Sequence, residues 1–172
     1  MSSSSLRPLR RDDLDCVRAW RNHPEIRRYM YTQHVISAEE HVAWFERARK
    51  DPLKHLLLFE IEGVASGFVN ISIVDERARR AEWGFYLSPE ATHGSGALLG
   101  EAALEYAFIK LGLHKLCSEA LIDNERSIRF HQKLGFEQES RLRHHHFDGE
   151  FYYDVIGFGL LQQDWNSKQG AD

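Results

Sequence analysis

A strand-like run meets a long helix-like run within residues 88–108, SPEATHGSGALLGEAALEYAF. The junction, Thr92 to Ala97, has two glycines spaced i and i+2, and glycine permits backbone conformations in which several N–H groups point at one anion. The following helix would add the positive end of its dipole. The same residues are equally typical of a helix N-terminus at which glycine and serine act as caps. A strand, a tight loop and a helix in succession favour folds in which helices cover a sheet.

The N-terminal part of the chain begins with a short strand and a helix. The strand is expected at residues 6–9, and the helix at 14–22, ending before a proline. Asp12 or Asp13 is the expected cap of this helix, because an aspartate side chain accepts hydrogen bonds from the first free N–H groups. One further helical turn should follow.

Residues 36–50 are predicted to form a helix, because Ser37 and Glu40 have the spacing of a capping box. Val42, Phe45 and Ala48 mark its apolar face at helical spacing. Three β-rich runs joined by short turns come next, which predicts an antiparallel meander. These runs are residues 55–63, 64–75 and 80–89.

The second half has longer elements. A helix rich in Ala and Leu should end at Gly112, where a left-handed residue is wanted, and a buried strand should follow at 115–122. Asn124 and Gly135 are expected to bound another helix. The chain should close with a hairpin that turns at residues 148–149, an Asp-Gly pair.

This order of elements predicts the fold class. One strand, two helices, three meandering strands, a helix, a strand, a helix and two strands imply a mixed sheet with helices on both faces. The class is therefore α/β or α+β. The 172 residues, of which 42% are hydrophobic, suit one globular domain over residues 1–172.

Charge and composition exclude several kinds of partner. A net charge of −4 argues against a general nucleic-acid binder, so the ligands should be small. Cys16 and Cys117 lie among apolar neighbours and are interpreted as buried free thiols of a reducing compartment. The start of the chain lacks the apolar core of a signal peptide, and no apolar run approaches a membrane span. We expect a soluble, cytoplasmic protein without a membrane partner.

Two sequence blocks carry a resemblance to a known family. Gly94 and Gly96 match the phosphate loop Gln/Arg-x-x-Gly-x-Gly/Ala, although Ala91 replaces the usual Gln or Arg. Asn124, Ser127 and the Leu-Gly-Phe at 134–136 match the second block. With the order of elements, the chain resembles the GNAT superfamily of acetyl-CoA-dependent N-acetyltransferases. The resemblance implies a mixed, mostly antiparallel, twisted sheet of seven strands.

The resemblance also implies the coenzyme site. Acetyl-CoA would be the acetyl donor, with pantetheine along the fourth strand, pyrophosphate on the loop and the coenzyme arm at Asn124. No metal or redox cofactor enters this chemistry. The implied coenzyme-binding residues are Phe85, Tyr86, Leu87, Thr92, His93, Gly94, Ser95, Gly96, Ala97 and Asn124.

Acetyl transfer to an amine needs a proton acceptor and a proton donor. Glu82 is predicted to be the base, since related enzymes often keep a carboxylate on this strand; a solvated strand charge is the alternative. His131 stands where many relatives carry the tyrosine that acts as general acid, and a histidine can also protonate a leaving thiolate. It could equally be a helix-surface residue, with water or a tyrosine as the acid. The candidate tyrosines are Tyr86, Tyr152 and Tyr153.

Two other features invite chemistry that we do not expect. Cys117 lies in an apolar strand, whereas reactive thiols need an electropositive, accessible site, so it is interpreted as a packing residue. The three histidines at 144–146 alternate faces on a strand and cannot all reach one ion. We predict no metal site.

Residues 20–45 should select the acceptor. This run is dense in Trp, Tyr, Arg and His, which suit phosphates and planar rings. It resembles the N-acetyltransferases of the pseudaminic-acid pathway, which act on the 4-amino group of a UDP-linked 4-amino-4,6-dideoxy sugar. The implied nucleotide-sugar-binding residues are Arg21, Asn22, Met30, Tyr31, His34 and Phe45. For Phe45 a buried helix stripe is the alternative.

Two other functions stay open at this point. The segments 6–15 and 154–165 also resemble ribosomal-protein N-acetyltransferases, which would make a protein N-terminus the acceptor. The departures at Ala91 and His131 also allow a non-catalytic acyl-CoA sensor. Because the final strands of such folds are exposed and often pair, a homodimer is a further expectation.

Overall fold

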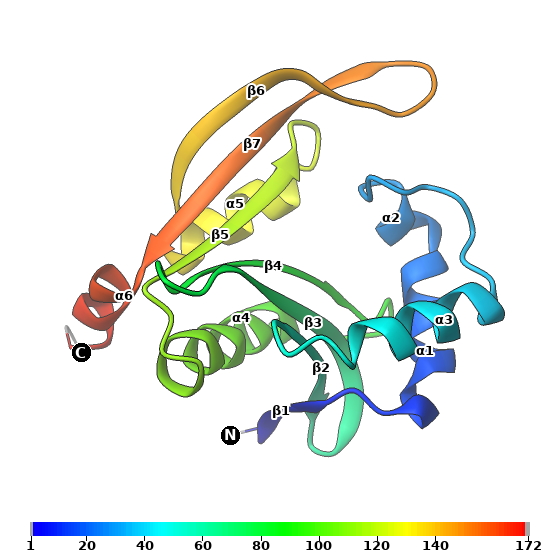
Figure 1. Cartoon of the computed structure of the whole chain (residues 1–172), viewed down its shortest axis with the longest axis horizontal. Coiled ribbons are helices and arrows are strands. Elements are labelled where there is room, and N and C mark those ends of the chain that lie inside the picture. Colours follow the sequence, from blue (N-terminus) through cyan, green and yellow to red (C-terminus); the bar gives the residue numbers. More distant parts are fainter. Residues whose placement is uncertain (1, 171–172) are drawn as a thin grey trace.

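The computed structural model describes residues 2–170, and Figure 1 shows a strongly twisted sheet with helices against both faces. The strands are β1 (Ser4–Pro8), β2 (Lys54–Ile61), β3 (Val64–Asp75), β4 (Arg80–Leu87), β5 (Lys115–Leu121), β6 (Glu137–Phe147) and β7 (Tyr152–Leu161). The helices are α1 (Leu14–Asn22), α2 (Pro24–Arg27), α3 (Ala38–Ala48), α4 (Ser95–Glu105), α5 (Glu125–Leu134) and α6 (Gln162–Gln169), with a 3-10 turn at Arg11–Asp13 and a π turn at Tyr106–Lys110. The predicted fold class is confirmed.

The seven strands form one sheet in the order β1-β2-β3-β4-β5-β7-β6. Only β4 and β5 are parallel neighbours, and every other pair is antiparallel. β6 is the outer strand at the C-terminal edge, which is the edge that a second copy would use. The homodimer itself stays a prediction.

Strand alternation divides the core into two layers. On β2, Leu56 and Leu58 face the cluster that α1 and α3 cover, which includes Val17 and Phe45. Phe59, like its neighbour Leu57, faces the larger cluster on the other side, which α4 covers. The helices therefore flank the sheet as the order of elements predicts.

The predicted turns and caps are largely confirmed. Ser37 Oγ accepts a hydrogen bond from the backbone N–H of Glu40 at 3.1 Å. Asn124 caps α5 through the N–H of Ser127 at 3.2 Å. Gly135 ends that helix with a φ of +98°. The hairpin after β6 turns at residues 148–151, where the Asp148 carboxylate accepts hydrogen bonds from the backbone N–H groups of Glu150 and Phe151.

Two details of the structure differ from the sequence-based prediction. The Asp13 side chain does not cap α1; it accepts hydrogen bonds from the backbone of Arg10 and from the Arg7 guanidinium, at 2.7 and 2.8 Å, because the chain first makes a 3-10 turn. Helix α6 was not expected, because its polar sequence buries a single large residue, Trp165.

None of the helices between residues 2 and 170 is both long and apolar enough to span a membrane.

Candidate active site

The two parallel strands at the centre of the sheet separate. Their last paired residues are Glu82 and Cys117, whereas β4 continues to Leu87 and β5 to Leu121. Beyond Glu82, the edge of β4 that faces β5 therefore has no strand partner within the described chain. Such an edge can pair with an extended ligand such as pantetheine. The separation opens a pocket of about 410 Å³.

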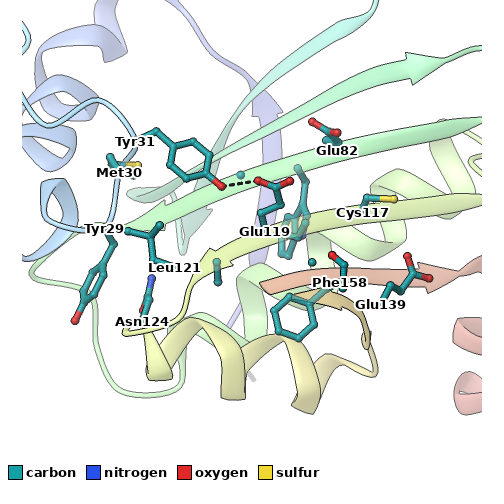
Figure 2. Close-up of a pocket in the computed structure, with 16 residues that line it drawn as sticks. Tyr29, Met30, Tyr31, Glu82, Cys117, Glu119, Leu121, Asn124, Glu139 and Phe158 are labelled. Carbon is teal, nitrogen blue, oxygen red and sulfur yellow. Dashed lines mark hydrogen bonds between the residues drawn. The ribbon is translucent and has the colours of Figure 1, made fainter. Parts of the chain in front are cut away.

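Strands β4 to β7 and the N-terminal segment 29–31 line this pocket, as Figure 2 shows. Three carboxylates face it from three different strands: Glu82 of β4, Glu119 of β5 and Glu139 of β6. The other lining residues are Tyr29, Met30, Tyr31, Trp83, Gly84, Cys117, Ser118, Ala120, Leu121, Asn124, Ser140, Gly157 and Phe158. The pocket therefore joins the segment expected to select the acceptor to the separated strands.

Glu82 lies where a base for this pocket would have to be. Its side chain is exposed, while its neighbours Ala81 and Trp83 are buried on the other face. It lies beside Cys117 in the sheet register. Burial raises the pKa of the Cys117 thiol, which leaves it protonated and a poor nucleophile. Glu82 is thus the better candidate for proton transfer, and its role as base stays a prediction.

The glycine loop leads directly into α4. Gly94 has a φ of +91°, and no side chain within residues 2–170 caps the first turn of the helix. The N–H of Ser95 donates to the Thr92 carbonyl at 3.1 Å, whereas those of Gly96 and Ala97 are available to an anion beside the positive helix end. A Cβ on Gly96 would lie 3.6 Å from the Phe130 ring and 3.7 Å from Leu87, so the loop lies between the end of β4 and α5. Of the alternative in which glycine and serine act as caps, one part holds: Gly94 is the N-cap residue of α4, whereas the hydroxyl of Ser95 contacts only that of Thr92.

Replacing Gly94 with alanine should weaken acetyl-CoA binding. The left-handed backbone at Gly94 costs an L-residue about 1–2 kcal/mol, so relaxation of the loop would redirect the N–H groups. We expect the Kd for acetyl-CoA, measured by calorimetry, to rise about 5- to 30-fold. Gly149→Ala is the matched control, because Gly149 has a φ of +103° at the hairpin tip, where a Cβ also meets open space. Equal affinities for the two variants would contradict the loop assignment.

His131 is buried rather than on a helix surface. It is 1% exposed, and its ring stacks on Phe158 at 5.1 Å. Nδ1 donates to the Ser127 carbonyl at 2.8 Å, so in the neutral ring Nε2 is an acceptor, and it has no partner among the described residues. Burial lowers the pKa of His131. A neutral ring without a free N–H is a poor proton donor, so this geometry lends no support to the predicted general-acid role.

The segment expected to bind the acceptor is only partly assembled at this pocket. Met30 and Tyr31 line it, and the Tyr31 hydroxyl reaches Glu119 of β5 at 2.5 Å. Asn22 instead makes two hydrogen bonds to the backbone of Ile36, at 2.7 and 2.9 Å, which hold the loop before α3.

The remaining candidates lie on the N-terminal side. The imidazole Nε2 of His34 lies 2.8 Å from the Glu40 carboxylate. Phe45 is 5% exposed in the core beneath α3, which is the structural alternative named for it. Arg21 is half-buried, and its Nη2 donates to the Thr32 carbonyl at 2.7 Å.

Sequence reasoning missed two residues of interest. Glu119 lies two positions after Cys117, so strand alternation could have placed it on the Glu82 face. His41 is 6% exposed and stacks on Trp44 at 5.0 Å, and its Nδ1 has no partner in the described part of the chain. No sequence signal distinguishes His41 from a surface histidine, because it lies next to the predicted apolar stripe.

Parallel strands that separate over a pocket, with a glycine loop and a helix N-terminus beside them, define the class of coenzyme-dependent acyltransferases. The chain belongs to the acetyltransferase (GNAT) domain family, whose pattern matches residues 5–137. It is an N-acetyltransferase that uses acetyl-CoA as donor. The resemblance inferred from the two sequence blocks is thereby confirmed.

Named relatives cover most of the chain. Spermidine N(1)-acetyltransferase of Escherichia coli (strain K12) is 29% identical over 164 residues, covering 95% of this chain and 88% of that protein. Acetyltransferase PseH of Campylobacter jejuni (strain 81-176) is also 29% identical, over 131 residues, covering 74% of this chain and 79% of that protein. Spermidine N-acetyltransferase from Vibrio cholerae, solved with CoA and spermine, superposes with a TM-score of 0.87 at 24% identity, covering 95% of this chain and 98% of that one.

Proposed function

We propose that the protein transfers the acetyl group of acetyl-CoA to the 4-amino group of a UDP-linked 4-amino-4,6-dideoxy sugar. The segment 20–45 supports this acceptor through its resemblance to the pseudaminic-acid pathway enzymes and through the position of Met30 and Tyr31 beside Glu82. The relationship to PseH is consistent with it.

The observation that carries the proposal is an unsatisfied guanidinium. Arg21 Nη1 is buried and has no hydrogen-bond partner within residues 2–170, and burial lowers the pKa of this side chain. Nη2 bonds the Thr32 carbonyl, but a buried guanidinium nitrogen without an acceptor is costly unless an anion pairs with it. Arginine binds phosphate oxygens through two parallel N–H groups. The pyrophosphate of a nucleotide sugar is such an anion.

Aromatic rings next to this arginine can hold the base. Trp44 and Tyr86 are partly exposed and pack on the buried Phe68 ring, at 6.0 Å and 5.2 Å, so these two rings are the ones that can face a base. Tyr86 influences the pKa of Arg21, so the two side chains are neighbours. The unpaired Nδ1 of His41, stacked on Trp44, adds a polar group for a uracil or a phosphate. The uridine diphosphate would lie on this side, with the sugar amine toward Glu82.

The chemistry is a direct transfer in a ternary complex. The acceptor ammonium loses one proton to the Glu82 carboxylate, which passes it to water. The neutral amine attacks the thioester carbon, forming the C–N bond while the C–S bond breaks. The second amine proton ends on the coenzyme sulfur, giving the acetamido sugar nucleotide and free CoA. No side-chain nucleophile is needed.

CoA release by the purified protein, given acetyl-CoA with each acceptor in turn, tests the proposal. We expect release with the 4-amino sugar nucleotide and none with spermidine or N-terminal peptides. Arg21→Met should raise the KM for the sugar nucleotide about 10- to 100-fold, which corresponds to the free energy of one hydrogen bond between charged groups. Arg28→Met is the control, because Arg28 is exposed and pairs with Glu25 at 3.6 Å. Unchanged KM in Arg21→Met would exclude the pyrophosphate assignment.

A polyamine is the second candidate acceptor, because three carboxylates line the pocket. Carboxylates suit a cationic chain, and two of the relatives above act, by name, on spermidine. Release with spermidine and a KM insensitive to Arg21→Met would establish this alternative. Release with peptides alone would assign the protein to N-terminal acetylation, and release with none of them would exclude all three acceptors.

A further inference from the structure

A hydrogen bond spans the pocket between segments 88 residues apart. The Tyr31 hydroxyl, from the segment after α2, donates to Glu119 Oε2 of β5 at 2.5 Å (Figure 2). The Tyr31 ring also packs against His146 of β6, with ring centroids 5.1 Å apart. Tyr31 is thus held from two strands, and it in turn fixes the orientation of the Glu119 carboxylate.

The charges around this bond are unbalanced. Of the three pocket carboxylates, Glu139 is paired with Lys115, whose Nζ lies 2.8 and 2.9 Å from its oxygens. Glu82 and Glu119 have no Lys, Arg or His partner among residues 2–170. Burial, the hydrogen bond to Glu119 and the charges of Glu119 and Glu82 raise the pKa of the Tyr31 hydroxyl, and both carboxylates line the same pocket. Two such charges in one pocket favour a cation between them.

The free acceptor positions point to the same cation. Tyr31 occupies Oε2 of Glu119 and leaves Oε1 without a protein donor in the described chain. A carboxylate oxygen accepts about two hydrogen bonds, so Oε1 can accept from an ammonium in the pocket that Glu82 also lines. The raised pKa keeps the Tyr31 hydroxyl a donor at neutral pH, so this orientation of Glu119 persists.

We propose that Glu119, oriented by Tyr31, binds the acceptor as its ammonium and positions it for proton transfer to Glu82. Glu119 takes up no proton in this step: one ammonium proton passes to Glu82 and water, a second reaches the coenzyme sulfur as the C–N bond forms and the C–S bond breaks, and the third stays on the amide nitrogen. This role rests on the acceptor being a primary amine, as the proposed function requires, and not on which amine it is.

The test compares an amine acceptor with its alcohol analogue. The amine is whichever acceptor of the panel above releases CoA with the wild type, so a wrong sugar assignment leaves the test intact. Glu119→Gln keeps an oxygen for the Tyr31 hydroxyl but removes the charge. We expect the KM for the amine to rise about 10- to 100-fold, with unchanged KM for acetyl-CoA and unchanged inhibition constant for the alcohol. Equal weakening of amine and alcohol, or no weakening of either, overturns the proposal.

Tyr31→Phe separates orientation from charge. It retains the Glu119 charge and removes a single hydrogen bond, so the KM for the amine should rise only about 2- to 12-fold. A larger effect than that of Glu119→Gln would contradict the positioning role.

NMR of ¹³C-labelled tyrosine gives a readout that needs no acceptor. Glu119→Gln should lower the pKa of Tyr31, because it removes a negative charge next to the hydroxyl. An unchanged Tyr31 titration would mean that the bond to Glu119 does not exist in solution, and it would overturn the proposal whatever the acceptor is.

Discussion

Glu82→Gln should lower kcat about 100- to 10,000-fold, the contribution of a positioned general base. The amide retains the size and hydrogen-bonding capacity of the side chain but cannot accept the ammonium proton. Glu82 is exposed at the last paired position before the strands separate, so the substitution should leave the fold intact. The measurement is CoA release at saturating acetyl-CoA and acceptor across pH, with a circular dichroism spectrum of each variant.

Glu105→Gln is the matched control for Glu82→Gln. Glu105 is an exposed carboxylate at the end of α4 and does not line the pocket, so its kcat should equal that of the wild type. A Glu82→Gln enzyme that retains wild-type kcat across pH would mean that another group accepts the proton. Glu119, oriented in the same pocket, would then be the group to exchange next.

The free energy of unfolding should fall as the pH drops below about 6.5, and His131 should carry a defined part of that fall. Burial lowers the pKa of His131 in the folded protein. Below the ordinary histidine pKa the unfolded chain therefore binds a proton that the folded chain does not, so acid favours unfolding. One such group changes stability by about 1.4 kcal/mol per pH unit until its folded pKa is reached. His41 and His55 have lowered pKa values for the same reason and add to the wild-type slope.

His131→Phe isolates this contribution. The ring lies among aromatic neighbours, including Phe158 at 5.1 Å and Trp83 at 5.7 Å, which can accept a phenyl group. Urea unfolding at several pH values between 5 and 7 gives the free energy of unfolding at each pH. For His131→Phe, the slope of this free energy against pH should be about 1.4 kcal/mol per pH unit smaller than for the wild type. Phe130→Leu is the control, since it alters the same cluster without removing a titrating group. Identical slopes for His131→Phe and the wild type would refute the buried neutral ring.

The same variant decides whether His131 is the general acid. A rate loss at low pH, where a histidine acid would carry its proton, together with loss of the high-pH fall in kcat, would support that assignment. An unchanged kcat would assign thiolate protonation to water or to a tyrosine. Tyr86 is then the nearest of the three candidates to the coenzyme strand, since it lies on β4 itself.

Local signals in the sequence predicted most of the elements. Ser37, Asn124 and Gly135 cap or end helices through contacts within a few residues, and such contacts depend little on the rest of the fold. Asp13 and α6 were not predictable in the same way. The Asp13 carboxylate binds the Arg7 guanidinium of β1, and α6 owes its one buried residue, Trp165, to packing on Phe108 at 5.4 Å.

The candidate site follows the same division. The alternation of β4 predicted that Glu82 faces away from Trp83, and the glycine spacing predicted the loop at Gly94, because both depend only on backbone geometry. Glu119 and His41 could not be singled out. Glu119 stands out because the hydroxyl of Tyr31, 88 residues away, binds it. His41 stands out because its buried ring nitrogen has no partner among the described residues.

By itself the sequence determined the order of elements, the glycine loop, the face of Glu82 and the family, because short-range spacing sets backbone conformation and side-chain direction. The tertiary structure alone decided where the parallel strands part, how Tyr31 reaches Glu119, and that His131 is buried. Each of these features depends on contacts between segments that only the folded sheet brings together. The burial of a side chain and the charges around it follow from those contacts, so no local sequence pattern predicts them.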